Sequence, residues 1–485
     1  MCSRPTRSPH TTERRRGPSD EVTLRPSSRL PRSRGPLAGL AVLSLILLAT
    51  GSAADASPQA APTTHGTAGF ACGYNNRGSL GLGSSAQALT PVPVNLPAGT
   101  TGMSAGVDFT VARTRDGRVY AWGDNRDGQL GQGTRANHLA AVRVRIPGSP
   151  LVIRVDAAGE HTVALARNGR IYAWGNNARG QLGDGTTTDR STPVRVHLPR
   201  SAGRVVDIAA GTDHTLAVTA SGRVLAWGRS TEGQLNGASG ADRTLPTFVP
   251  LPPGSHVTKV AAGLGHSLAL TSRGTVLTWG EPQGTQVGGT PGRRDVRSVA
   301  RLDHLHVIAI DAGTDSSLAL TRRGRVFSWG DGSDGQLGDG TTADRLTPVK
   351  VGGLPPVTAI SAAGGHVVAV ARNGQLWVWG ANQFGQLGDG TTTNSTRPQR
   401  LTALSGAQVT VLATGELHTL VAVNRGPSQH PATGLRDGQA VSSSARSGSG
   451  WGWQPWTGLV LAALGLTLAS AVAIRLRSRR QPALP

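Results

Sequence analysis

The sequence predicts an all-β protein: a seven-bladed β-propeller whose last blade is closed by both ends of the repeat region, with an N-terminal signal segment and one C-terminal transmembrane helix. Three observations predict it. A Trp-Gly pair recurs about every 50 residues, one repeat unit is divided between the ends of the repeat region, and two apolar segments lie outside it. The composition agrees, because 67 glycines and 30 prolines among 485 residues, with only 16% charged, are typical of many short strands and turns.

The repeat is marked by six Trp-Gly pairs spaced 50 to 53 residues apart. Cys72-Gly73 stands 50 residues before the first pair within similar flanking sequence, and it therefore marks a seventh copy with cysteine in the tryptophan position. A fixed period of this length indicates a repeat architecture. The six tryptophans are Trp122, Trp174, Trp227, Trp279, Trp329 and Trp379.

Each copy predicts four short strands. In one copy, residues 205–211, 214–219 and 223–227 show the period-two alternation of β-strands. In five copies, the fourth strand is expected to begin with a proline nineteen residues after the tryptophan position: Pro91, Pro193, Pro246, Pro348 and Pro398. Because proline lacks an amide donor, this strand is expected at the outer edge of its sheet. Four antiparallel strands in each period predict propeller blades.

The two ends of the repeat region predict how the ring closes. Residues 409–415 and 418–423 repeat only the first two strands of the unit, whereas residues 70–94 contain only the last two. An open solenoid has no reason to divide a unit between its ends, while a closed ring gains a joint. We therefore expect seven blades, with the two ends completing the last blade.

The repeated unit, A-G-x-x-H-T-L-A-V-x-x-x-G-R-V-x-x-W-G-x-N-x-x-G-Q-L-G-D-G-T, resembles the repeat of the regulator of chromosome condensation family over roughly residues 67–426. The resemblance implies a seven-bladed propeller, in agreement with the strand count. It implies little about function, because the family includes nuclear exchange factors, plant and animal signalling domains, and secreted bacterial inhibitors of β-lactamase.

The N-terminal segments predict secretion. Residues 1–35 form a basic, disordered N-region, and residues 36–56 have the apolar stretch and the Ala-x-Ala site of a signal peptide, or of a signal anchor where cleavage does not occur. Residues 57–66 then link this segment to the propeller, which spans 67–426.

The C-terminal segments predict a membrane tether. Residues 427–456 form a disordered linker, and residues 457–474 are 18 residues without a charge, long enough to cross a membrane as a helix. The basic tail 475–485 predicts a cytoplasmic C-terminus. The propeller is therefore expected outside a bacterial cell membrane, in a single-pass protein, or in a two-pass protein where the N-terminal segment is retained.

The charge and the motifs predict neither nucleic-acid binding nor catalysis. Of the net charge of +21, ten charges lie in the two terminal tails, and the rest are spread without Lys/Arg blocks or interleaved aromatics. Cys2 and Cys72 cannot form a disulfide framework or a zinc site. Because no nucleophile elbow, Walker loop or acid–base pair is present, we expect a non-enzymatic protein without metal or cofactor.

Five histidines occupy one equivalent position, thirteen residues before the tryptophan in each copy where one follows: His161, His214, His266, His366 and His418. They are compatible with a ring of ligands. The structural interpretation is favoured, because Phe109 and Ser316 replace them without other change and an iterated His-Thr pair suits the hydrogen bonding of each blade. The six tryptophans are likewise expected to be structural, each wedged between neighbouring blades.

Two loop aromatics predict a partner-binding patch. Tyr74 lies two residues after the cysteine that replaces the tryptophan, and Phe384 lies five residues after Trp379, at positions where most copies carry polar residues. Ring closure places their loops on adjacent blades, and aromatic residues are favoured anchors of protein interfaces. Packing within the loops is the alternative.

Taken together, these features predict a monomeric, non-enzymatic, extracytoplasmic propeller tethered to the cell membrane, which binds a protein or cell-wall component through its blade loops. One alternative is an inhibitor of a secreted hydrolase such as a β-lactamase. Another is a regulator of guanine-nucleotide exchange, which the predicted topology opposes.

Overall fold

The computed structural model of the protein describes residues 67–236, 240–281, 285–288 and 295–424. The predicted signal segment and transmembrane helix lie outside the described residues. Among the residues that are described, no helix is long and apolar enough to cross a membrane.

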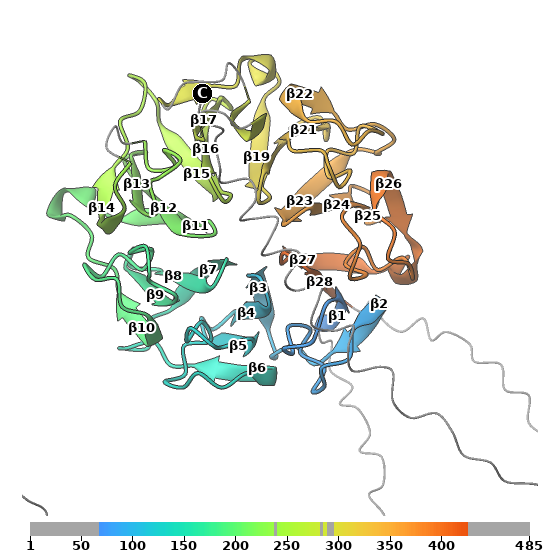
Figure 1. Cartoon of the computed structure of the whole chain (residues 1–485), viewed down its shortest axis with the longest axis horizontal. Helices are drawn as coiled ribbons and strands as arrows, with labels where there is room; N and C mark the ends of the chain where they lie inside the picture. The colour runs from blue at the N-terminus through green and yellow to red at the C-terminus, as the bar shows by residue number, and fades with distance from the viewer. Residues whose placement is uncertain (1–66, 237–239, 282–284, 289–294, 425–485) are drawn as a thin grey trace, which may run out of the picture. The chain divides into compact units, whose positions relative to one another are not determined.

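The described strands form seven four-stranded antiparallel sheets around a central axis (Figure 1). The first blade contains β3 (Thr100–Ala105), β4 (Phe109–Thr114), β5 (Val119–Gly123) and β6 (His138–Val144). The second contains β7 (Val152–Ala158), β8 (His161–Ala166), β9 (Ile171–Gly175) and β10 (Arg190–Arg195). The third contains β11 (Val205–Ala210), β12 (His214–Thr219), β13 (Val224–Gly228) and β14 (Arg243–Phe248).

The next three blades follow the same order. The fourth contains β15 (Val257–Ala262), β16 (His266–Thr271), β17 (Val276–Gly280) and β18 (Arg297–Ser298). The fifth contains β19 (Val307–Ala312), β20 (Ser316–Thr321), β21 (Val326–Gly330) and β22 (Arg345–Lys350). The sixth contains β23 (Val357–Ala363), β24 (His366–Ala371), β25 (Leu376–Gly380) and β26 (Ser395–Leu401). The described connections also hold η1 (Arg200–Ala202), η2 (Thr285–Val287), η3 (Ala300–Leu302) and η4 (Thr402–Leu404).

The seventh, composite blade joins the two ends of the repeat region. Its strand order is β2 (Ala88–Val94), β1 (Thr67–Gly73), β28 (His418–Asn424) and β27 (Gln408–Thr414). Strands β1 and β28 pair antiparallel through seven residues, from Thr67 opposite Asn424 to Gly73 opposite His418. This pairing confirms the predicted joint, and seven sheets confirm the predicted propeller.

The outer strands are correctly predicted as edges, but their start is wrong. In the five outer strands that contain the predicted proline, it is the fourth residue rather than the first: Pro91 in β2, Pro193 in β10, Pro246 in β14, Pro348 in β22 and Pro398 in β26. In β10, for example, the strand begins at Arg190 and Pro193 follows three residues later. The register of β10 against β9 shifts between Arg190 and Val194, so the missing amide of Pro193 falls in an irregular stretch of the ladder.

The six repeated tryptophans are buried between adjacent blades. Each indole Nε1 donates a hydrogen bond of 2.7 to 2.9 Å to a carbonyl in the long loop of the preceding blade. Trp174 of the second blade, for example, packs in one cluster with Val111 and Leu130 of the first blade and binds the carbonyl of Gln129. In the composite blade, Cys72 takes this place with its thiol 3.6 Å from the carbonyl of Gln386.

The five repeated histidines also join blades, which corrects the expectation that each serves its own blade. Their Nε2 atoms lie 2.9 to 3.0 Å from a Thr or Ser hydroxyl of the following blade. His418 of the composite blade reaches Thr110 of the first blade and so helps to close the ring. Burial lowers the pKa of all five imidazoles to about 3 or 4, which keeps them neutral.

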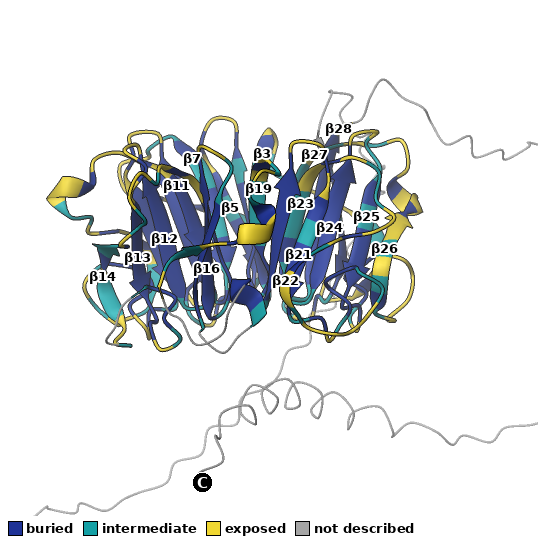
Figure 2. Ribbon diagram, turned by 90° about the horizontal axis from the view of Figure 1, so that it is seen from above, coloured by how far each residue is buried: buried dark blue, intermediate teal, exposed yellow. Residues whose placement is uncertain are grey.

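The propeller has two faces, because neighbouring strands of a blade run in opposite directions. The long-loop face carries the turns between the inner and second strands and the long loops between the third and outer strands; there, the amide of Asp124 donates to the carbonyl of Asp108 at 2.9 Å. The short-turn face carries the turns between the second and third strands and the connections between blades. There, the amide of Arg115 donates to the carbonyl of Gly99 at 2.8 Å. The strands between the two faces are largely buried, and the exposed residues gather at the faces and outer edges (Figure 2).

Candidate partner-binding site on the long-loop face

The two predicted anchor residues lie side by side. Tyr74 follows β1 in the long loop of the composite blade, and Phe384 follows β25 in the long loop of the sixth blade. Their ring centroids are 5.1 Å apart and their planes meet at 72°, an edge-to-face contact. Both side chains are half-buried. The structure therefore brings together two residues that are 310 positions apart in the chain, on one face and across one blade joint.

Backbone contacts hold this aromatic pair in place. The amide of Tyr74 donates to the carbonyl of Leu417 at 2.9 Å, which fixes the start of the loop against the turn that precedes β28. The amide of Phe384 donates to Oε1 of Gln386 at 3.0 Å, and Nε2 of Gln87 donates to the carbonyl of Phe384 at 2.7 Å. Because the partners come from both blades, the pair is positioned by the fold before any partner binds.

The same face is strongly acidic. Its described turns and loops carry eighteen Asp and Glu residues against five Arg residues, and no Lys. Five of the carboxylates lie in the turns nearest the propeller axis: Asp108, Glu160, Asp213, Asp315 and Glu416. Glu416 directly precedes Leu417, whose carbonyl binds Tyr74, so the acidic rim continues to the edge of the aromatic pair.

Burial and mutual repulsion disturb the titration of this rim. Burial, with the charge of Asp124, raises the pKa of Asp108 to about 6. Burial, with Asp127, raises the pKa of Glu160 to about 8, and burial, with Asp108, raises that of Glu416 to about 7. Arg77 relieves part of the repulsion, since its guanidinium lies 3.4 Å from Asp124 and 3.8 Å from Asp108. Crowded carboxylates of this kind are stabilised by an approaching cation.

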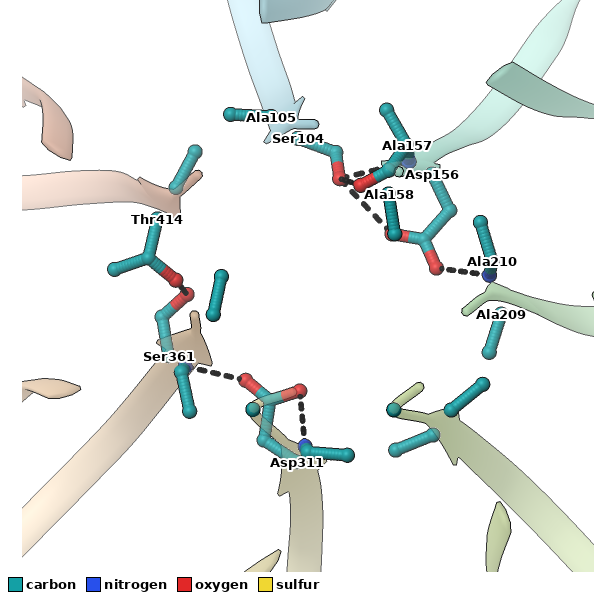
Figure 3. A pocket seen from close by; sticks show the side chains of 18 of the residues that line it. Ser104, Ala105, Asp156, Ala157, Ala158, Ala209, Ala210, Asp311, Ser361 and Thr414 are labelled. Carbon is teal, nitrogen blue, oxygen red and sulfur yellow. Dashed lines mark hydrogen bonds between the residues drawn. The ribbon is translucent and has the colours of Figure 1, made fainter. Parts of the chain in front are cut away.

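The propeller axis holds a cavity of about 260 Å³ lined by the inner strands (Figure 3). Two of the carboxylates that line it are engaged by neighbouring blades: Asp156 accepts a hydrogen bond from the amide of Ala210, and Asp311 accepts one from the amide of Ala362, both at 2.9 Å. Burial raises the pKa of Asp311 to about 7. These residues hold blades together, and no group of three His, Cys, Asp or Glu side chains within the described ranges is placed to bind a metal ion.

Sequence reasoning missed these axial contacts. At five of the seven blade joints, a polar side chain of one inner strand makes a hydrogen bond to the inner strand of the next blade. For example, Asp207 accepts a hydrogen bond from the amide of Val260 at 3.1 Å, and the hydroxyls of Ser361 and Thr414 are 2.8 Å apart. At four of these joints the available signal was an Asp or Ser at one inner-strand position where the other copies have Ala: Ser104, Asp156, Asp311 and Ser361. Asp207 stands two residues earlier in its copy, at a position that varies among the repeats. This signal becomes interpretable only once the blades are placed in a ring.

Comparison with known proteins identifies the repeat. The model of the RCC1-like domain matches residues 142–434, and models of the regulator of chromosome condensation (RCC1) repeat match residues 70–113, 116–165 and 101–129. The ultraviolet-B receptor UVR8 of Arabidopsis thaliana is 31% identical over 218 residues, which cover 44% of this chain and 49% of the receptor. The human E3 ubiquitin-protein ligase HERC2 is 33% identical over 218 residues, which cover 4% of the ligase. The chain thus spans about half or less of the length of these curated relatives.

Solved structures agree with the fold. Prp20p of Saccharomyces cerevisiae, whose structure is described with its binding properties to Gsp1p and histones, matches with a TM-score of 0.67 and 24% identity over 76% of this chain and 93% of that chain. Human WBSCR16 matches with a TM-score of 0.66 and 24% identity over 74% of this chain and 99% of that chain.

Proposed function

Because this chain belongs to the family of RCC1-like domains, whose model matches more than half of it, we propose that it is a non-enzymatic interaction propeller that binds a partner through its long-loop face. The partner is a protein or cell-wall component, and the contact centres on Tyr74 and Phe384. We place the propeller outside the cell membrane, held there by the predicted transmembrane helix 457–474.

The contact between Tyr74 and Phe384 carries this proposal. Aromatic pairs with this edge-to-face geometry stabilise each other, and aromatic residues are enriched among the residues that dominate binding energies. Here the two rings come from different blades, are fixed by backbone hydrogen bonds, and still keep part of their surface open to solvent. A preorganised pair of this kind loses little conformational freedom when a partner binds.

The charge of the long-loop face indicates the chemistry of the partner. An excess of thirteen carboxylates over arginines among the described loop residues repels acidic surfaces and attracts basic ones. A Lys or Arg side chain of the partner can approach both the rim near Glu416 and the faces of the aromatic pair, as in cation–π contacts. We therefore expect a partner that presents an apolar or cationic side chain surrounded by basic residues.

The test is site-specific photo-crosslinking of the full chain in the cells that produce it. One photoreactive residue replaces Asn76, which is exposed beside Tyr74, and another replaces Ser272, which is exposed on the short-turn face. We expect a partner to be captured from position 76 and not from position 272. The double variant Tyr74→Ala/Phe384→Ala should reduce this capture about tenfold or more, as loss of a binding centre does.

The control is Phe248→Ala, which removes another half-buried phenylalanine, one that packs against the guanidinium of Arg223 away from the long-loop face. It should leave capture from position 76 unchanged. Equal capture from positions 76 and 272, or capture that survives the double variant, contradicts the proposed binding face. A captured secreted hydrolase, inhibited when purified propeller protein is added, would indicate the inhibitor function in place of a wall-binding scaffold.

A further inference from the structure

The short-turn face is as basic as the long-loop face is acidic. Its described turns and blade connections carry fourteen Arg residues and two Asp residues, and they contain no Lys or Glu. All fourteen arginines are exposed. Within the part of the chain that the structure describes, Arg118 with Asp116, 3.1 Å apart, is the one salt bridge among them. The charge of this face is therefore available to an external partner.

The arginines are distributed around the ring. Six of the seven blades present at least one arginine in the short turn between their second and third strands: Arg115, Arg167, Arg223, Arg273, Arg322 and Arg372. The backbone holds these turns in the same way, because each is hydrogen-bonded to the residue that precedes the inner strand of its own blade. The amides of Arg167, Arg322 and Arg372 donate to the carbonyls of Leu151, His306 and Pro356. The guanidinium groups therefore form a broad ring around the short-turn face and are not gathered in one groove.

The composite blade has no such turn, because the repeat region begins and ends there. Strand β1 starts at Thr67, opposite the last residue of β28, Asn424, and both residues lie at the short-turn end of their sheet. The chain therefore enters and leaves the propeller through the basic face. Whichever predicted membrane segment is retained, its connection to the propeller is made on this side.

From these observations we infer that the short-turn face lies against the anionic phospholipid headgroups of the membrane that tethers the chain. This inference rests on the tether in the proposed function. A guanidinium binds phosphate oxygens through paired hydrogen bonds, and a flat ring of such groups matches a planar surface of phosphates. A flexible linker of 32 residues, the number between Asn424 and the predicted helix, has a root-mean-square reach of roughly 30 Å, which is short enough to hold the disc near the headgroups.

The arrangement assigns different roles to the two faces. Attraction by anionic lipids acts within a Debye length, about 10 Å at ordinary salt, so only the basic face can benefit from it. The acidic long-loop face is repelled by the same surface. The disc is thereby oriented with Tyr74 and Phe384 directed away from the membrane, where a partner can reach them.

The test measures the orientation of the full chain in lipid nanodiscs. Cys2→Ser removes a labelling site outside the described residues, and a fluorophore is attached after either Ser221→Cys on the short-turn face or Thr342→Cys on the long-loop face, both exposed positions. A quencher is carried on the lipid headgroups. With 30% phosphatidylglycerol in phosphatidylcholine, we expect quenching at position 221 at least fivefold stronger than at 342. This difference should disappear in pure phosphatidylcholine or at 1 M NaCl.

A matched pair of variants separates local charge from net charge. Arg322→Gln/Arg323→Gln/Arg325→Gln removes three positive charges from one short turn and should reduce the quenching difference at least twofold. Ser84→Glu/Ser85→Glu/Ala86→Glu makes the same change in net charge in an exposed loop of the opposite face and should leave the difference unchanged or larger. Equal effects of the two triple variants would overturn the inference.

The outcomes also separate this inference from the tether. A chain that is extracted from cell membranes by alkaline carbonate lacks the predicted tether; its basic face should then still bind phosphatidylglycerol vesicles in a salt-sensitive way. An integral chain with equal quenching at both positions retains the tether and refutes the lipid contact. Duplex DNA that binds the short-turn face while the nanodisc difference is absent would refute it too, in favour of a nucleic-acid partner.

Discussion

Replacing Trp227 with alanine removes the side chain that joins the second and third blades. Trp227 is fully buried and packs in one cluster with Val163 and Leu182 of the second blade, and its Nε1 donates to the carbonyl of Gln181 at 2.8 Å. Loss of a buried tryptophan costs about 3 to 5 kcal/mol, from lost apolar burial and the cavity that remains. Loss of the indole hydrogen bond to the carbonyl of Gln181 adds little to this destabilisation, because the hydroxyl of Thr215 also donates to that carbonyl, at 2.8 Å.

The assay is urea unfolding of the full chain followed by far-ultraviolet circular dichroism, which does not depend on the removed indole. A loss of about 3 to 5 kcal/mol is a large fraction of the stability of a typical domain, so the midpoint should fall clearly. Trp377→Ala is the control, because Trp377 is half-buried and lies outside the repeated joint position. If Trp227→Ala destabilises the protein no more than Trp377→Ala does, the joint role of the repeated tryptophans is wrong.

Three further predictions follow from the structure. Burial lowers the pKa of His214 to about 3 on folding, so the unfolded state binds more protons than the folded state below about pH 6.5. The free energy of unfolding of wild type, relative to that of His214→Gln, should therefore fall by about 2 to 3 kcal/mol between pH 7 and pH 4.5. A difference that does not change with pH would contradict a buried neutral imidazole. Gly83→Ala should cost about 1 to 2 kcal/mol, because the residue has a positive φ but nothing lies within 4 Å of an added Cβ. Gly123→Ala should be at least twice as destabilising, because its Cβ would lie 2.4 Å from the carbonyl oxygen of Asp108. Equal melting temperatures of the two variants would argue against this difference. Burial raises the pKa of the Cys72 thiol to about 12, which leaves little reactive thiolate in the folded protein. In a Cys2→Ser background, iodoacetamide should therefore modify Cys72 on the order of a hundredfold more slowly in the native protein than in the unfolded protein. Mass spectrometry of samples taken over time would measure the two rates.

The fold was largely predictable because its information is repeated. A period of about 50 residues, four alternating segments and a divided unit each define the blade independently, and any one copy is checked by the other six. The exception is the fourth blade, whose outer strand β18 has two residues where other blades have six or seven. Like the first blade, it lacks the proline found in the five other outer strands, so that residue gave no signal there.

Contacts between blades were less predictable, because a single repeat does not define the register between neighbours. The histidine position was correctly singled out, yet its partner is a hydroxyl about 50 residues away in the next blade, as for His214 and Ser267 at 3.0 Å. The proximity of Tyr74 and Phe384 could be predicted only because both loops are equivalent positions of adjacent copies and the ring was assumed closed.

The charge asymmetry was hidden in the sequence for a related reason. Acidic and basic residues alternate along each repeat, so the chain shows no charged block. Folding assigns successive turns to opposite faces, which gathers Asp124 and its equivalents on one side and Arg115 and its equivalents on the other. The net charge of the chain therefore indicates less about its binding surfaces than the order of its strands does.

Both face assignments depend on the pairing of β1 with β28, and a single engineered disulfide tests it directly. Cys72 lies opposite Thr419 in the register, and the thiol of Cys72 and the hydroxyl of Thr419 both approach the carbonyl of Gln386, at 3.6 and 2.8 Å. Thr419→Cys, in a Cys2→Ser background refolded with oxidised and reduced glutathione, should therefore link the two strands. Mass spectrometry of tryptic peptides should show residues 72 and 419 joined in most molecules; two free thiols in a folded protein would mean that the chain ends do not close the ring.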